Sequence, residues 1–311
     1  MEKHDLVIIG GSAAGTTAGI YAARRNLDVR VVAKDLGGEV ATSGEVENWP
    51  GTMHTDGFAL AKNFSDHLAR YDVPVDEGVE VKSIKKINDC SFCIKTKNGG
   101  ADECDYVAKA VIVATGAHPK KLRATGEDEF KNKGVSYCTV CDGPLFKGKT
   151  VAIIGGGNSS LEASLMMSDL SPKVYVITID PRFTGDPMLV DKLKTKTNVE
   201  VIFNANTTEV FGDKFVKGLK YKDKDGTERK LEVDGIFVHI GLTPNSSFVP
   251  PEVEKDKFGQ IKVNANCETN VPGFYAAGDV TDVPFKQIVI AAGQGTIALL
   301  SAAGYLNRLA Q

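Results

Sequence analysis

Leu6-Val7-Ile8-Ile9-Gly10-Gly11-Ser12-Ala13-Ala14-Gly15 is the stretch that decides the fold, and small residues continue from it to Ala23. The apolar run predicts a strand, the glycines predict a tight turn, and the small residues predict a helix. This order opens a dinucleotide-binding unit, because a helix N-terminus offers unpaired backbone N–H groups to a pyrophosphate and a turn without side chains lets it approach. Residues 10–15 are the first glycine turn.

The pattern occurs a second time at residues 151–160. Val151-Ala152-Ile153-Ile154 precedes Gly-Gly-Gly-Asn-Ser-Ser, the second glycine turn (residues 155–160). Apolar strands that end on glycine, at residues 110–116 and 235–241, close both units, and each leads into a proline-containing linker. A strand at residues 273–279 and a helix from about Gln287 to Leu309 complete the first unit. We therefore predict an α/β fold with two doubly wound, Rossmann-like domains, residues 117–243 being inserted into a domain of residues 1–116 and 244–311.

The composition is that of an ordinary globular chain. Its 311 residues are 42% hydrophobic and 25% charged, enough for two domains with their own cores. A net charge of -3 with scattered Lys and Arg gives no reason to expect nucleic acid or an anionic membrane as a partner. No run of 18 apolar residues exists, and the first strand begins almost at Met1. We expect a cytoplasmic protein without a signal peptide.

Residues 277–279, Ala-Gly-Asp, follow the late strand. A carboxylate at Asp279 can accept a hydrogen bond from a ribose or ribitol hydroxyl, although a helix N-cap is the alternative interpretation. Because Ser12 replaces the middle glycine of the usual fingerprint, the first glycine turn alone is a weak sign of a nucleotide site. Asp279 strengthens the prediction of a nucleotide site.

The redox loop, Cys138-Thr139-Val140-Cys141-Asp142, carries the predicted chemistry. A Cys-x-x-Cys pair can form a redox-active disulfide. Structural zinc is the alternative, but it needs four ligands and no second Cys or His pair of suitable spacing follows, so we predict no metal site. Asp142 is placed to move a proton to or from a thiolate, unless it only forms the turn before Gly143.

The other four cysteines predict no chemistry. Cys90 and Cys93 have the same spacing as the redox pair, but in the strand expected there residues i and i+3 point to opposite faces. We interpret these two as unrelated packing residues, and Cys104 and Cys267 as lone structural residues.

This combination resembles the low-molecular-weight thioredoxin reductases along nearly the whole chain. The resemblance implies FAD in the first domain, a homodimer, and an inserted domain whose rotation carries the cysteine pair from the flavin to the surface. It also implies that Cys141 takes electrons from the flavin, that Cys138 exchanges with a thioredoxin disulfide, and that Asp142 is the acid/base. The resemblance is carried by residues 10–15, 37–38, 46–51, 114–116, 138–142, 155–160 with Glu162, 277–282 and 286–287.

The same resemblance implies the FAD contacts. Glu39 stands where a glutamine usually follows the paired glycines, which is a departure from the family pattern. The predicted FAD residues are Gly10, Ser12, Ala13, Ala14, Gly15, Gly37, Gly38, Glu39, Asn48, Val81, Thr115, Gly116, Gly278, Asp279, Lys286, Gln287 and Ile288.

The nicotinamide site departs further, which makes the chain an atypical member. Members that use NADPH have paired arginines after the second strand of the inserted domain, where this chain has residues 178–182, Thr-Ile-Asp-Pro-Arg. Asp180 would repel a 2′-phosphate, whereas an acidic residue about 20 positions beyond a glycine turn accepts the 2′-hydroxyl of NADH. NADPH is therefore disfavoured, and NADH or a ferredoxin-type carrier that reduces the flavin directly remain open as donors. The predicted nicotinamide-nucleotide residues are Gly155, Gly157, Asn158, Ser159, Ser160, Asp180 and Arg182.

We thus predict an FAD-dependent thioredoxin-disulfide reductase whose partner is thioredoxin or a similar dithiol protein. A ferredoxin reductase of similar architecture would lack the Cys138/Cys141 pair. A peroxidase-linked variant would carry an appended domain, which we do not expect before Asp5. A non-enzymatic flavin/dithiol redox sensor is the third alternative.

Overall fold

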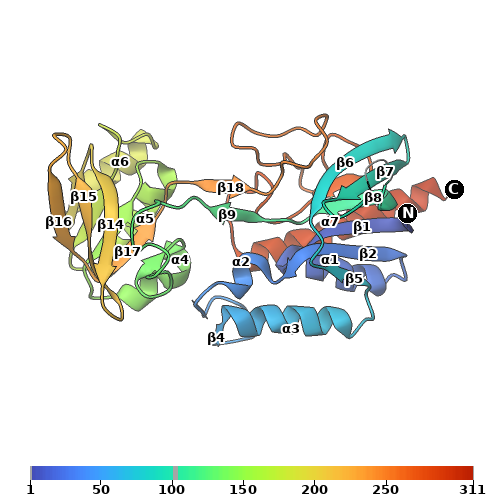
Figure 1. Ribbon diagram of the computed structural model, residues 1–311, viewed down its shortest axis with the longest axis horizontal. Coiled ribbons are helices and arrows are strands. Elements are labelled where there is room, and N and C mark those ends of the chain that lie inside the picture. The colour runs from blue at the N-terminus through green and yellow to red at the C-terminus, as the bar shows by residue number, and fades with distance from the viewer. Residues whose placement is uncertain (1, 101–103, 311) are drawn as a thin grey trace. The chain divides into compact units, whose positions relative to one another are not determined.

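Both glycine turns join a strand to a helix in the computed structural model, which describes residues 2–100 and 104–310. β1 (Glu2–Gly11) leads through the first turn into α1 (Ala13–Ala23). β11 (Val151–Ile154) leads through the second turn into α5 (Asn158–Leu170). The chain divides into an outer unit, Met1–His118 with Thr243–Gln311, and an inserted unit, Pro119–Leu242 (Figure 1).

A largely parallel sheet forms the centre of the outer unit, with the order β5-β2-β1-β8-β7-β6 and with β19 also paired to β8. Leu6 and Ile8 of β1 face one buried cluster, and Val7 and Ile9 face another on the opposite side. Burial on both faces explains why this strand is a continuous apolar run. The other strands are β2 (Val29–Leu36), β5 (Val75–Glu77), β6 (Val81–Asn88), β7 (Ser91–Thr96), β8 (Tyr106–Val113) and β19 (Phe274–Ala276), with a small hairpin of β3 (Glu45–Val46) and β4 (Thr55–Asp56).

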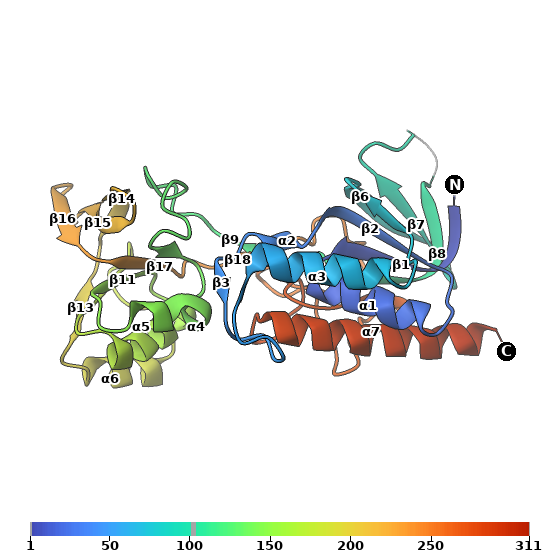
Figure 2. The same ribbon diagram turned by 90° about the horizontal axis from the view of Figure 1, so that it is seen from below.

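Helices cover the face of the sheet to which Leu6 and Ile8 point. α1 packs against α7 (Ile288–Leu309) (Figure 2). The two helices are so close that a methyl group on Gly295 would lie 2.1 Å from the carbonyl oxygen of Ala14. α7 is long and apolar enough to cross a membrane by length and composition. It nevertheless contributes Ala298, Leu299, Ala302 and Leu306 to the core cluster of the outer unit. The remaining helices are α2 (Gly38–Ala41) and α3 (Gly57–Ala69).

The inserted unit repeats this plan on a smaller scale. Its parallel sheet has the order β10-β17-β11-β12-β13, beside a three-stranded antiparallel sheet β14-β15-β16. Parallel sheets in both units confirm the predicted α/β class. The strands are β10 (Val135–Ser136), β12 (Val174–Ile177), β13 (Val199–Ile202), β14 (Asn206–Gly212), β15 (Val216–Lys222), β16 (Glu228–Glu232) and β17 (Gly235–Val238), and the helices are α4 (Thr139–Asp142), the 3-10 turn Gly143–Phe146 and α6 (Pro187–Lys194).

Two short strands mark the passages between the units. β9 (Ala117–Pro119) and β18 (Leu242–Pro244) pair with each other, at the two proline-containing segments where linkers are predicted. The linkers therefore run side by side.

Candidate active site

The redox loop is a single turn of helix between β10 and the second glycine turn. Cys138 caps α4, and the backbone N–H of Cys141 donates to Cys138 Sγ at 3.2 Å. The two cysteines form a disulfide, with their Cα atoms 5.3 Å apart. Cys141 is exposed and Cys138 is half-buried. An accessible disulfide of this kind can take part in thiol–disulfide exchange.

Ser136 fixes the carboxylate beside this disulfide. Its buried hydroxyl donates to Asp142 Oδ2 at 2.5 Å and accepts from the backbone N–H of Cys138 at 3.1 Å. One side chain thereby ties the predicted acid/base to the first cysteine. No motif marks Ser136 in the sequence, since a serine at the end of a strand is an ordinary residue.

A second side chain that sequence reasoning missed holds the other end of the loop. Thr139 is 3% exposed, and its Oγ1 lies 2.6 Å from Nε2 of His239. His239 follows β17, and burial lowers the pKa of this imidazole to about 4. The ring is therefore neutral near pH 7.

The second glycine turn lies next to His239. A methyl group on Gly155 would lie 2.2 Å from the carbonyl oxygen of His239, so no larger residue fits there. At the following residue, a methyl group on Gly156 would lie 3.6 Å from Asp180 Oδ2. The turn thus places a carboxylate beside the backbone that a dinucleotide would approach.

The remaining predicted nicotinamide residues are spread around this turn. Ser160 is fully buried and donates to the carbonyl of Gly157 at 2.8 Å, so its hydroxyl fits the close contact between helix and turn. Asn158 Oδ1 accepts from the backbone N–H of Asp186 at 2.7 Å. Ser159 and Arg182 are exposed.

The first glycine turn forms a cradle of backbone without side chains. A methyl group on Gly15 would lie 1.8 Å from the carbonyl oxygen of Gly10. Ser12 donates to the carbonyl of Gly37 at 2.6 Å, which joins this turn to the paired glycines. A methyl group on Gly278 would lie 3.3 Å from Cβ of Ala14. Three predicted FAD segments therefore meet at the carboxyl ends of β1, β2 and β19.

Other predicted FAD residues contact segments that are far away in the sequence. Asn48 Nδ2 donates to Gln287 Oε1 at 3.3 Å. Thr115 donates to the carbonyl of Asn245 at 2.6 Å. Ile288 begins α7 and packs on a small cluster with Val40. Val81, by contrast, begins β6 with its side chain in the core, which leaves only its backbone for a ligand.

Asp279 and Lys286 give the site its charge. Burial raises the pKa of Asp279 to about 6, while Lys286 lowers it and Glu39 raises it further. Burial also lowers the pKa of Lys286, whose Nζ donates to the carbonyl of Thr281 at 2.6 Å. A poorly solvated carboxylate is an acceptor that a ribityl or ribose hydroxyl would satisfy. The cradle and this acceptor fit FAD.

Comparisons with known proteins give the family. The sequence matches the model of the pyridine nucleotide-disulphide oxidoreductases over residues 4–295. The chain belongs to this family. The solved thioredoxin reductase of Giardia duodenalis is 32% identical, with a TM-score of 0.92 and coverage of 99% of this chain and 100% of that chain. A ferredoxin-flavin thioredoxin reductase from Clostridium acetobutylicum is 29% identical, with a TM-score of 0.55 and coverage of 100% and 99%.

Two curated members of the family carry other names. The F protein of alkyl hydroperoxide reductase in Escherichia coli (strain K12) is 41% identical over 99% of this chain. NADH dehydrogenase of Bacillus subtilis (strain 168) is 40% identical over 99% of this chain. The chain spans 59% of the length of each. The fold is that of a flavoprotein disulfide reductase, as the resemblance implies.

One interpretation of the cysteines is wrong for this family member. Cys93 was interpreted as a packing residue and Cys104 as a lone structural residue, but the two form a disulfide with their Cα atoms 5.3 Å apart. β7 and β8 are antiparallel, so the chain returns and places Cys104 beside the strand that carries Cys93. Spacing alone could not show this, because the pairing depends on the hairpin register. Cys90 is free and exposed, and Cys267 is free and buried.

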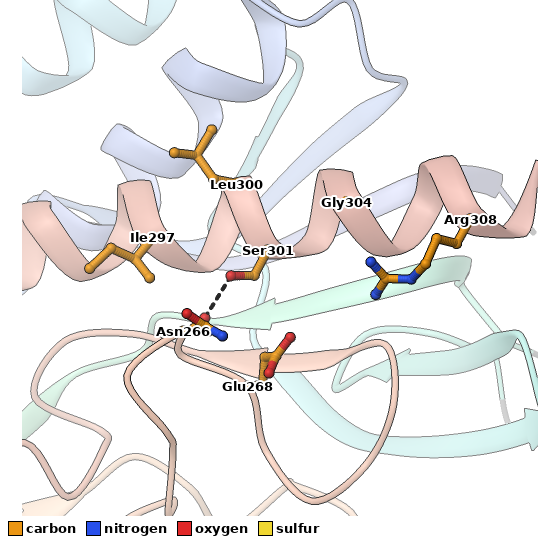
Figure 3. Close-up of a pocket in the computed structure, with 7 residues that line it drawn as sticks. All are labelled: Asn266, Glu268, Ile297, Leu300, Ser301, Gly304 and Arg308. Carbon is orange, nitrogen blue, oxygen red and sulfur yellow. Dashed lines mark hydrogen bonds between the residues drawn. The ribbon is translucent and has the colours of Figure 1, made fainter.

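A surface depression of about 430 Å³ lies on the outer unit, and none of the residues that line it is a predicted site residue. Figure 3 shows these lining residues. α7 lines one side of the depression and Asn266 and Glu268 line the other. Ser301 bridges the two sides by donating to the carbonyl of Asn266 at 2.8 Å. Neither glycine turn contributes to this depression, so it is not part of the redox site.

Three side chains on the β3–β4 hairpin lie within 4.8 Å of one another: Glu45, Glu47 and His54. All are exposed, and His54 Nδ1 lies 3.5 Å from Glu47 Oε1. The sequence predicts no histidine ligand set, and exposed acidic groups of this kind are common without a metal.

Proposed function

We propose that this protein is an FAD-dependent reductase that passes electrons through the Cys138/Cys141 pair to the disulfide of a thioredoxin-like protein. The observation that carries the proposal is the Cys138–Cys141 disulfide with Asp142 held beside it by Ser136. Reduction of this disulfide takes two electrons and yields a dithiol. The Cys138 thiolate then attacks the partner's disulfide, and Cys141 displaces the partner as a dithiol and restores the original bond.

In this proposal the outer unit holds FAD by its backbone. The first glycine turn and the N-terminus of α1 receive the pyrophosphate, and Asp279 accepts a hydroxyl. When bound, FAD would supply the hydride-transfer and single-electron redox chemistry of its flavin. Asp142 gives or takes the proton that each exchange step requires.

NADH is the donor we propose. Asp180 lies beside the second glycine turn, where a carboxylate binds a 2′-hydroxyl and opposes a 2′-phosphate. The similarity to a protein named NADH dehydrogenase supports this choice. A ferredoxin-type carrier is the second candidate, supported by the similarity to a ferredoxin-flavin thioredoxin reductase.

Anaerobic flavin bleaching tests the donor. The FAD-loaded protein is mixed with NADH, NADPH or reduced ferredoxin, and flavin absorbance is followed. We expect fast bleaching by NADH and slow bleaching by NADPH. Fast bleaching by NADPH would overturn this assignment, and bleaching by ferredoxin alone would replace NADH with the second candidate.

The acceptor is tested separately. We expect oxidised thioredoxin to be reduced by the wild-type protein and not by Cys138→Ser. A Cys138→Ser protein with full activity would defeat the catalytic role of this residue. The similarity to an alkyl hydroperoxide reductase protein supports a second acceptor class, the dithiol proteins that serve peroxide reduction, and a peroxiredoxin assay distinguishes it.

A homodimer and a cytoplasmic location complete the proposal. Both come from the resemblance to thioredoxin reductases. Sedimentation of the FAD-loaded protein at twice the monomer mass would support the dimer, and sedimentation at the monomer mass would contradict it.

A further inference from the structure

The redox loop is attached to the inserted unit at three points. Ser136 holds Asp142 and the backbone of Cys138. Gly143 ends α4 against Met167, since a methyl group there would lie 3.0 Å from the Met167 sulfur. Thr139, between the two cysteines, is held by His239 at 2.6 Å. Ser136 and Gly143 flank the loop closely in the sequence. His239, by contrast, comes from the carboxyl end of β17.

His239 is fixed on its other side by the second glycine turn. Its backbone N–H donates to the carbonyl of Ile154 at 2.8 Å, at the end of β11. Its carbonyl oxygen occupies the space that a side chain at Gly155 would need. Because Thr139 is buried, the Thr139–His239 pair cannot shift without moving either the loop or the turn.

We propose that His239 is a positioning residue for the Cys138/Cys141 pair. Through Thr139 it holds the pair at a fixed position relative to the second glycine turn. The inference rests on the proposed function, because it assigns a role in the chemistry of the same dithiol. The imidazole forms its hydrogen bond with Thr139, one of the two residues between the cysteines, rather than with a sulfur. It acts by holding the first turn of α4.

The consequence for the thiols follows from the geometry of that turn. The backbone N–H of Cys141 points at Cys138 Sγ at 3.2 Å, and such a donor favours the thiolate over the thiol. When the first residue of the turn is released, this donor loses its fixed direction. The reduced Cys138 should then ionise at higher pH and react more slowly near pH 7.

A neutral imidazole suits this role. It forms one hydrogen bond to the Thr139 hydroxyl in either tautomer, because a hydroxyl can both donate and accept. It adds no charge that would attract the thiolate directly. A glutamine of similar reach can make the same hydrogen bond, whereas leucine cannot.

The test measures the pH dependence of Cys138 alkylation in the FAD-loaded protein after reduction by dithiothreitol, with peptide mass spectrometry to separate Cys138 from Cys141. We expect His239→Leu and Thr139→Val each to raise the pH midpoint and to slow alkylation at pH 7 roughly five- to tenfold, with no further loss in the double variant. His239→Gln should restore the wild-type rate. Thr195→Val is the control, because that hydroxyl donates to the carbonyl of Lys192 at the end of α6, away from the loop.

Unchanged alkylation in both folded single variants would overturn the proposal, as would a His239→Gln protein as slow as His239→Leu. If His239→Leu does not fold, Thr139→Val alone decides. The assay needs neither the donor nor the acceptor protein. A wild-type protein that reduces no thioredoxin-like partner would defeat the proposed function and leave this measurement intact.

Discussion

The hydroxyl of Ser136 lies 2.5 Å from Oδ2 of Asp142 and donates a hydrogen bond to it. The two residues are on opposite sides of the redox disulfide in the sequence, and α4 folds them together. A buried serine that orients a carboxylate preserves its direction without changing its charge. The side chain of Asp142 is therefore oriented by β10, which carries Ser136, as well as by its own helix α4.

Replacement of Ser136 by alanine should slow exchange with the acceptor. The carboxylate of Asp142 loses one oriented donor, and Cys138 N–H loses its acceptor. We expect a roughly tenfold fall in kcat for a thioredoxin-like acceptor, from the loss of about one hydrogen bond to a charged group, with flavin reduction by the donor unchanged. Ser168→Ala is the matched control, because the Ser168 hydroxyl donates to the carbonyl of Leu165 on α5. Equal rates in the two variants would show that Ser136 does not aim the acid.

Asp180 should set the preference between the nicotinamide nucleotides. In Asp180→Asn the charge is lost while the shape is kept, so the 2′-hydroxyl of NADH loses a charge-assisted acceptor and a 2′-phosphate is no longer repelled. We expect kcat/KM for flavin reduction by NADH to fall roughly tenfold and that for NADPH to rise. Asp191→Asn is the matched control, because its carboxylate pairs with Lys194 on α6, and it should leave NADH unaffected. An unchanged kcat/KM for NADH in Asp180→Asn would show that Asp180 does not bind the nucleotide.

The second disulfide should stabilise the outer unit. Cys93 and Cys104 close a loop of 11 residues in sequence separation, and a cross-link of this size lowers the entropy of the unfolded chain. We expect the Cys93→Ala/Cys104→Ala protein to lose about 2 to 3 kcal/mol in free energy of unfolding, measured by urea titration. Cys90→Ser should change it little, since that thiol is free and exposed. The native oxidised protein should show one fast-reacting thiol, Cys90, and two or more would mean that the Cys93–Cys104 bond is absent.

Local patterns made the fold predictable. Each glycine turn is marked by residues adjacent in sequence, and Leu6 to Ile9 had to be buried on both faces because the run has no polar alternation. The Cys138–Cys141 pair and Asp142 are likewise neighbours in sequence. Ser136 was missed because no motif marks a serine at the end of a strand, although its partners are near in the sequence. His239 and the Cys93–Cys104 bond were missed for a different physical reason. Their partners are chosen by strand register and by the return of β17 to the sheet, and no spacing rule encodes either.

Asp279 should make the stability of the FAD-free protein depend on pH. Burial raises the pKa of this carboxyl to about 6, above the value near 3.8 that it has when exposed, so folding costs free energy wherever the group must be charged. The cost is fully present above pH 6 and falls as the pH drops from about 6 toward 3.8, because the folded state then gains a proton before the unfolded state does. Lys286 reduces this cost and Glu39 adds to it.

Asp279→Asn removes the titration and keeps the shape. We expect the FAD-free variant to be more stable than the wild type by roughly 2 to 3 kcal/mol above pH 7, and the difference to shrink toward pH 4, in urea titrations across this range. Glu39→Gln should act in the same direction but more weakly, since it removes only the neighbouring charge that raises the pKa. A variant that is less stable than the wild type at pH 8 would mean that the Asp279 carboxylate is stabilised by the fold, and the raised pKa would then be wrong.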